Sequence, residues 1–151
     1  MPQVVGEIVI NRPVEQVFDF VADERNEPQF NPKVLTVEKV TPGPVGKGTR
    51  FRTQVKARRR TAEMSVEFTA YDRPRRLTSV SALSNMEIEG TLTFDPVPEG
   101  TRMRWSWDLA PRGTLRLATP VIGLIGRRQE RTIWTSLKHL LELDTPLERH
   151  S

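Results

Sequence analysis

The chain of 151 residues contains no cysteine and only two histidines, His139 and His150, both near the C-terminal end of the sequence. Without cysteine it can form no disulfide, no zinc–cysteine site and no thiol nucleophile. Two histidines near one end also disfavour a multi-histidine metal site and a Ser-His-Asp arrangement. We therefore expect neither a metal ion nor a bound cofactor.

Long hydrophobic runs are lacking as well. The longest segments without a charged residue span ten residues each, at 77–86 and 117–126. A membrane-spanning helix needs about 20 apolar residues, so no transmembrane segment is predicted. Acidic residues such as Glu7 and Glu15 interrupt the first part of the chain, which is not typical of a signal peptide. Together with a mean hydropathy of −0.47, this pattern leads us to expect a cytoplasmic protein.

Basic residues exceed acidic ones by 23 to 19, and the net charge of +4 is ordinary for a domain of this size. The densest basic run is Arg58, Arg59 and Arg60. Glutamates are interleaved with the basic residues, and no aromatic residue alternates with the arginines to offer a stacking platform for bases. The pattern is typical of a mixed solvated surface and disfavours nucleic acid as a partner. Peripheral contact with an anionic membrane surface stays open.

Alternation of apolar and polar residues predicts seven strands. They cover residues 4–10, 34–40, 51–57, 62–70, 77–83, 86–94 and 103–109. Segments rich in proline and glycine separate several of them and predict turns. If the hairpin between the third and fourth strands turns on residues 59 and 60, Lys56 faces Glu63 and Arg52 faces Glu67, two favourable pairs of opposite charge.

Helical spacing of apolar residues appears in two places. After the first strand, Val14, Val17, Phe18 and Val21 predict a short helix that Pro13 can open, and residues 23–30 predict a second short helix or a turn. From Thr119 onward the spacing predicts one long helix. Its inward stripe is predicted to consist of Ile122, Ile125, Gln129, Ile133, Ser136 and Leu140. Glu130 and the neighbouring arginines are predicted to lie mostly off this stripe.

This order of elements predicts an α+β fold. Every strand has one apolar and one charged face, so the simplest arrangement is a curved, seven-stranded antiparallel sheet around the long C-terminal helix. Two short helices lie between the first and second strands. We expect one domain over residues 1–144 and a polar C-terminal tail over residues 145–151.

Several short segments carry a resemblance to a known superfamily. They are INRPVEQVF at 10–18, QFNP at 29–32, VGKGTRF at 45–51, YDRPRRL at 71–77 and GTRMRW at 100–105. In this order, followed by a long arginine-rich helix, they resemble the START-like SRPBCC superfamily of polyketide cyclases, dehydrases and lipid-transfer proteins, although relatives commonly have Trp in place of Phe30. The resemblance spans essentially the whole chain. It implies the helix-grip fold, with a hydrophobic cavity between the sheet and the long helix.

The inward-facing residues of the predicted strands and helix are the candidates for binding a ligand in such a cavity. These candidates are Phe30, Phe51, Val55, Met64, Val66, Phe68, Met86, Ile88, Trp105, Trp107, Ile122, Ile125, Gln129 and Ile133. Aromatic rings and methionines give broad, adaptable apolar walls. The same side chains could instead fill a closed core, and the pattern does not decide between these two interpretations.

The resemblance implies binding of a hydrophobic or amphipathic small molecule, such as a lipid, a polyketide or an isoprenoid-like compound. Two alternatives remain: a polyketide cyclase or dehydrase, and a basic interaction module of the quinone-chaperone or ribosome-associated type. The strand carboxylates Glu63, Glu67, Glu87 and Glu89 are all predicted to point outward, so no catalytic residue can be assigned. Ligand identity, any reaction and the oligomeric state stay open.

Overall fold

The structure, a computed structural model, describes residues 3–57, 59–111 and 119–143, without the side chains of residues 119–127. All seven predicted strands are present and form one antiparallel sheet in the order β1-β7-β6-β5-β4-β3-β2. The strands are β1 (Gln3–Ile10), β2 (Val34–Lys39), β3 (Arg50–Ala57), β4 (Arg60–Asp72), β5 (Arg76–Leu83), β6 (Met86–Val97) and β7 (Gly100–Pro111). The helices are α1 (Val14–Ala22), the 3-10 helix η1 (Glu24–Gln29) and α2 (Thr119–Leu143).

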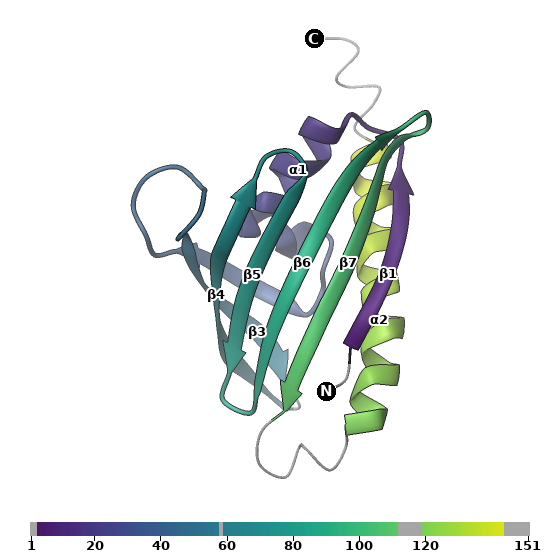
Figure 1. The fold of residues 1–151 in the computed structure, drawn as a ribbon. Coiled ribbons are helices and arrows are strands. Elements are labelled where there is room, and N and C mark those ends of the chain that lie inside the picture. The colour runs from purple at the N-terminus through teal and green to yellow at the C-terminus, as the bar shows by residue number, and fades with distance from the viewer. Residues whose placement is uncertain (1–2, 58, 112–118, 144–151) are drawn as a thin grey trace.

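These elements confirm the predicted helix-grip architecture. The sheet curves around α2, which lies along β1, while α1 and η1 complete the layer behind the sheet (Figure 1). The two short helices after β1 are those that the sequence predicts, and the second of them is a 3-10 helix with Pro28 inside it.

A cluster of buried side chains lies at the end of the sheet covered by α1, the upper end in Figure 1. Phe18 of α1 is fully buried and meets Tyr71 and Phe94 edge-on, at centroid distances of 5.2 and 5.1 Å. Ile10 and Met103 are fully buried in the same cluster. Edge-to-face pairs of this kind add about 0.5–1.5 kcal/mol each beyond the burial of their surface.

Polar contacts fix the C-terminal end of α2 to β1 and to the residues that follow it. Lys138 Nζ donates to the carbonyl oxygen of Val9 at 2.9 Å, and the Asn11 amide donates to Glu142 Oε2 at 2.9 Å. The Arg12 guanidinium donates to the Glu142 carbonyl at 3.0 Å. The helix therefore covers the edge strand β1 as well as the concave face of the sheet.

The hairpin between β3 and β4 differs from the predicted register. Ala57 pairs with Arg60, so the connection lies one residue earlier than predicted, and Arg59 adopts a positive φ of 65°. Consequently Lys56 faces Thr61 instead of Glu63. Arg52 faces Ser65 instead of Glu67, and its guanidinium contacts Glu38 at 3.1 Å. The shift moves each pairing by two positions, so every side chain keeps its predicted face.

Two glycines make room for two tryptophans on the concave face. A Cβ atom at Gly90 would lie 1.6 Å from Cε3 of Trp107, and one at Gly6 would lie 2.4 Å from Cζ2 of Trp105. Each indole therefore lies flat across the backbone of the strand beside β7, Trp105 over β1 and Trp107 over β6. The two rings thus extend in opposite directions from β7.

We predict that Gly90→Ala destabilises the fold by about 1–3 kcal/mol, because the new methyl group overlaps the Trp107 ring. Urea unfolding would measure the loss, and near-ultraviolet circular dichroism would report the displaced indole. Gly46→Ala is the matched control, since its φ is not positive and no atom beyond its chain neighbours lies within 4 Å of the position that the new methyl group would take. Equal stabilities of the two variants would contradict the described seating of Trp107.

Candidate functional site

Several inward-facing side chains are only half-buried at the end of the sheet away from α1, the lower end in Figure 1. They come from central and neighbouring strands and are mostly apolar. The set comprises Val55, Met64, Ser81, Met86, Ile88 and Trp107. Cross-strand pairing places them on the same face as the buried core. Solvent therefore reaches the concave face at this end.

The predicted ligand-binding residues divide between the closed core and this open end. Six of them are buried: Phe30, Phe51, Val66, Phe68, Trp105 and Ile133. Another six are half-buried: Val55, Met64, Met86, Ile88, Trp107 and Gln129. The side chains of Ile122 and Ile125 lie outside the described residues. The closed-core interpretation therefore holds for the six buried residues, while ligand binding stays a prediction for the six that are half-buried.

The inward stripe of α2 is rotated from the predicted one. Its buried residues are Ile133, Trp134, Leu137 and Leu141, whereas Ser136 and Leu140 are half-buried. Extended one turn toward the start of the helix, this stripe reaches Glu130. The prediction that Glu130 lies off the stripe is therefore wrong. Gln129 is half-buried, about 100° around the helix from Glu130.

Glu130 is held against the sheet by Trp107, whose Nε1 donates a hydrogen bond to Glu130 Oε1. Glu130 Oε2 accepts no hydrogen bond from a described residue and is not sealed from solvent. Beside it, Trp134 packs against Phe30 and Trp105, with ring centroids 5.7 and 5.9 Å away. A carboxylate thus stands at the border between an aromatic cluster and the open end of the concave face.

Burial raises the pKa of Glu130 from its ordinary value of 4.5 to about 7. The hydrogen bond from Trp107 opposes this shift, and the nearby Glu27 carboxylate of η1 adds to it. Glu27 also accepts a hydrogen bond from Asn31 Nδ2 at 2.8 Å. Burial, and then the neighbouring Glu27 carboxyl, raise the pKa of Glu24 well above its usual range. The Glu27 carboxylate of η1 therefore lies near enough to Glu130 of α2 to raise its pKa.

A carboxyl group that titrates near neutral pH can give or take a proton and can bind a polar group of a ligand. The described residues contain no group of three Asp, Glu or His side chains placed to hold a metal ion. Among the helices in the described part of the chain, none has the length and apolar character needed to cross a membrane. The arrangement offers the chemistry of the Glu130 carboxyl group, whose pKa lies near neutral pH.

Residues 1–142 match the family described as polyketide cyclase / dehydrase and lipid transport. The chain belongs to this family. The match covers the sheet and all but the last residue of α2, and confirms the superfamily that the short segments indicated. No curated protein matches the chain in sequence.

Solved structures share the fold of this family member. A START superfamily protein from Mycobacterium smegmatis is 13% identical, with a TM-score of 0.82 over 95% of this chain and 99% of that chain. TTHA0849 from Thermus thermophilus is 21% identical, with a TM-score of 0.74 over 91% and 95%. The di-domain ARO/CYC protein BexL of the BE-7585A biosynthetic pathway is 23% identical, with a TM-score of 0.77 over 96% of this chain and 48% of that chain. At these identities the likeness establishes the fold alone.

The raised pKa of Glu130 predicts how the stability of this cyclase/dehydrase-family chain depends on pH. Its folded-state pKa lies above the unfolded one, so the folded chain keeps a proton that the unfolded chain releases. The stability associated with that proton is present below the ordinary pKa of 4.5 and is lost as the pH rises through about 7. Glu130→Gln, which retains an acceptor for Trp107, should therefore raise the free energy of unfolding by roughly 1–3 kcal/mol near pH 8 and change it little near pH 5.

Urea unfolding of both proteins at the two pH values would measure this difference. The control is Glu89→Gln, which changes an exposed carboxylate on the outer face of β6. A stability gain for Glu130→Gln that is the same at both pH values, or the same as that of the control, would show that the Glu130 carboxyl is not buried as described.

Proposed function

We propose that this chain binds a hydrophobic or amphipathic small molecule on the concave face of its sheet, between the sheet and α2. The observation that carries this proposal is the half-buried set of apolar side chains at the end away from α1. Side chains such as Met64, Met86 and Ile88 face inward yet keep solvent contact, although core positions of this kind are ordinarily sealed. Aromatic and methionine surfaces of this size favour a flat or flexible apolar ligand. The family description, which includes lipid transport, supports the same function.

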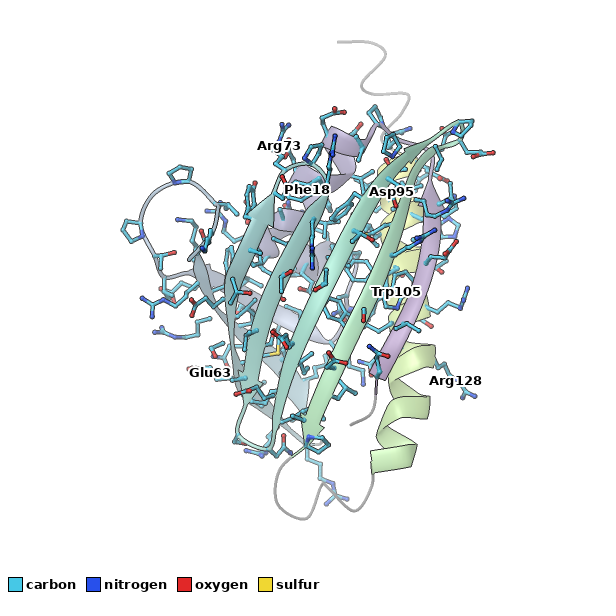
Figure 2. The ribbon with its side chains drawn as sticks, in the orientation of Figure 1. Phe18, Glu63, Arg73, Asp95, Trp105 and Arg128 are labelled. Carbon is cyan, nitrogen blue, oxygen red and sulfur yellow. The ribbon has the colours of Figure 1, made fainter. Side chains whose placement is uncertain are left out.

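Ion pairs on the surface support this choice over a basic interaction module. Several arginines that could bind an anionic surface are instead paired with carboxylates. Arg73 binds Asp19 at 2.7 Å, and Figure 2 shows it beside α1. Arg104 lies 3.4 Å from Glu7. Such pairs neutralise the charge that an anionic partner would need.

The proposal predicts that a bulky residue on the concave face blocks binding. Ser81 faces inward between Val66 and Ile88, so Ser81→Trp should reduce the affinity for the neutral dye Nile red by about tenfold or more, through loss of apolar contact area. Nile red fluorescence during titration would measure the affinity. Ser65→Trp is the matched control, because Ser65 is exposed on the outer face of the neighbouring strand β4. Equal affinities for the two variants would contradict binding on the concave face.

Glu130 favours a second candidate, proton transfer on a bound carbonyl compound, the type of step that a cyclase or dehydrase needs. A pKa of about 7 makes both protonation states available at neutral pH. The carboxylate form would take a proton from the carbon next to a carbonyl group. The electron pair of that C–H bond would form a C=C bond, and the carbonyl π electrons would move to oxygen.

This second candidate predicts that the chain speeds deuterium uptake at the carbon next to the carbonyl of α-tetralone in D₂O, followed by NMR. General base catalysis typically contributes about 10²–10⁴-fold, and the rate should rise with pH through the titration of Glu130. Glu130→Gln should remove the acceleration, whereas Glu89→Gln should leave it in place. Uptake no faster than in buffer, for a chain that binds the ketone, would exclude this activity.

A further inference from the structure

We infer that the polar end of the ligand is a hydroxyl group, which is bound by Glu130 and Trp134 at the border of the aromatic cluster. The inference rests on the proposed function and specifies the class of ligand. The first observation is that the two carboxyl oxygens of Glu130 differ in the hydrogen bonds they accept from described residues. Glu130 Oε1 accepts a hydrogen bond from Trp107, but Oε2 accepts none from a described residue.

The second observation is the indole of Trp134. Its side chain is more than nine-tenths buried, with 7% of its surface exposed, and its Nε1 has no hydrogen-bond partner among the described residues. This N–H lies near enough to Glu130 to favour the charged carboxylate, although it does not meet the geometry of a hydrogen bond. A buried donor without an acceptor is uncommon in folded proteins, so we expect Trp134 Nε1 to donate to an acceptor when the site is occupied. A buried N–H that forms no regular hydrogen bond with the described residues thus lies near a carboxyl oxygen that accepts none from them.

A hydroxyl group satisfies both atoms at once, since its oxygen accepts and its hydrogen donates. After a small rotation of the Glu130 side chain toward the ligand, the hydroxyl can donate to Oε2 and accept from Trp134 Nε1. It also suits both protonation states, because it donates to the carboxylate and accepts from the carboxylic acid. An ether oxygen can only accept, and an ammonium group can only donate.

Charge excludes the most common lipid headgroups. Glu27 of η1 lies near Glu130, and Glu24 lies beside Glu27. No described lysine, arginine or histidine forms an ion pair with Glu130 that could neutralise an incoming anion. A carboxylate or phosphate end would therefore meet like charges in surroundings of low dielectric constant. The structure favours neutral alcohols and phenols over fatty acids and phospholipids.

The test compares three probes with the same apolar chain, namely decanol, methoxydecane and decanoate, as competitors of Nile red near pH 8. For the native chain, decanol should bind about tenfold or more tightly than methoxydecane, because the hydrogen bond to the half-buried Glu130 carboxylate is lost in the ether. Decanoate should bind more weakly than either. In Glu130→Gln the amide oxygen should face Trp107, so that the amide NH₂ faces the ligand. The preference for decanol over the ether should then disappear, and decanoate should gain affinity.

Two further variants complete the test. Trp134→Phe retains the ring and removes the N–H, so it should weaken decanol and methoxydecane alike, while Glu89→Gln on the outer face should change nothing. Equal binding of decanol and methoxydecane to the native chain would overturn the inference, as would a decanol preference that survives in Glu130→Gln. If Nile red binds and no decyl probe competes, the inference fails and the proposed function stands. If Nile red does not bind, the proposed function fails and the inference falls with it.

Discussion

The hydrogen bond from Trp107 to Glu130 joins the sheet to α2 at the point where apolar packing ends. A simple geometric limit explains why packing must end somewhere. Six spacings of about 4.8 Å make the seven-stranded sheet roughly 29 Å wide, whereas a helix is only about 10–12 Å across. One helix cannot seal such a surface. α1 and η1 add cover at one end only, and the other end keeps inward-facing side chains in contact with solvent (Figure 1).

A glycine in the sheet, Gly90, makes room for the side chain that forms this hydrogen bond. Because Gly90 has no side chain, the indole of Trp107 can lie flat over β6. Its N–H then reaches Glu130 of α2. Trp105 does the same over Gly6 but extends toward β1, where it joins Trp134 and Phe30 in the closed aromatic cluster. Two tryptophans separated by one residue therefore have different roles. One closes the core, and the other orients a carboxyl group at its border.

Much of this fold was predictable from the sequence because apolar and polar residues alternate along strands that have one buried and one solvent-exposed face. That alternation indicated all seven strands and the face of every side chain in the β3–β4 hairpin. The register of this hairpin was misjudged because pairing depends on where the turn falls, and an arginine with positive φ at residue 59 leaves no clear mark in the sequence. Shifts of two positions also preserve the faces, so the charge pairs alone could not reveal the error.

The misplacement of Glu130 has a different cause. Periodicity assigns polar residues to the solvent-exposed side of a helix. Glu130 lies among arginines such as Arg128, which extends away from α2 in Figure 2. The spacing of Ile133, Trp134, Leu137 and Leu141 does contain the signal, because extending it back by one turn reaches residue 130. The local rule fails there because the tertiary hydrogen bond from Trp107 of β7 outweighs it. Departures of this kind are expected at functional sites, where a group is held in surroundings that its chemistry would otherwise avoid.

The proposed binding and the proposed proton transfer would both depend on the same property of the Glu130 carboxyl group. Surroundings that remove water from Glu130 raise its pKa, and they also strengthen any hydrogen bond that a ligand makes to it. A ligand hydroxyl that donates to Glu130 would stabilise the carboxylate and so lower its pKa again. A carbonyl group cannot donate a hydrogen bond, so a carbonyl compound would leave the pKa of Glu130 high. Both protonation states of the carboxyl group would then be populated near neutral pH. The functional group that a ligand presents would thus determine whether the site holds the molecule or acts on it.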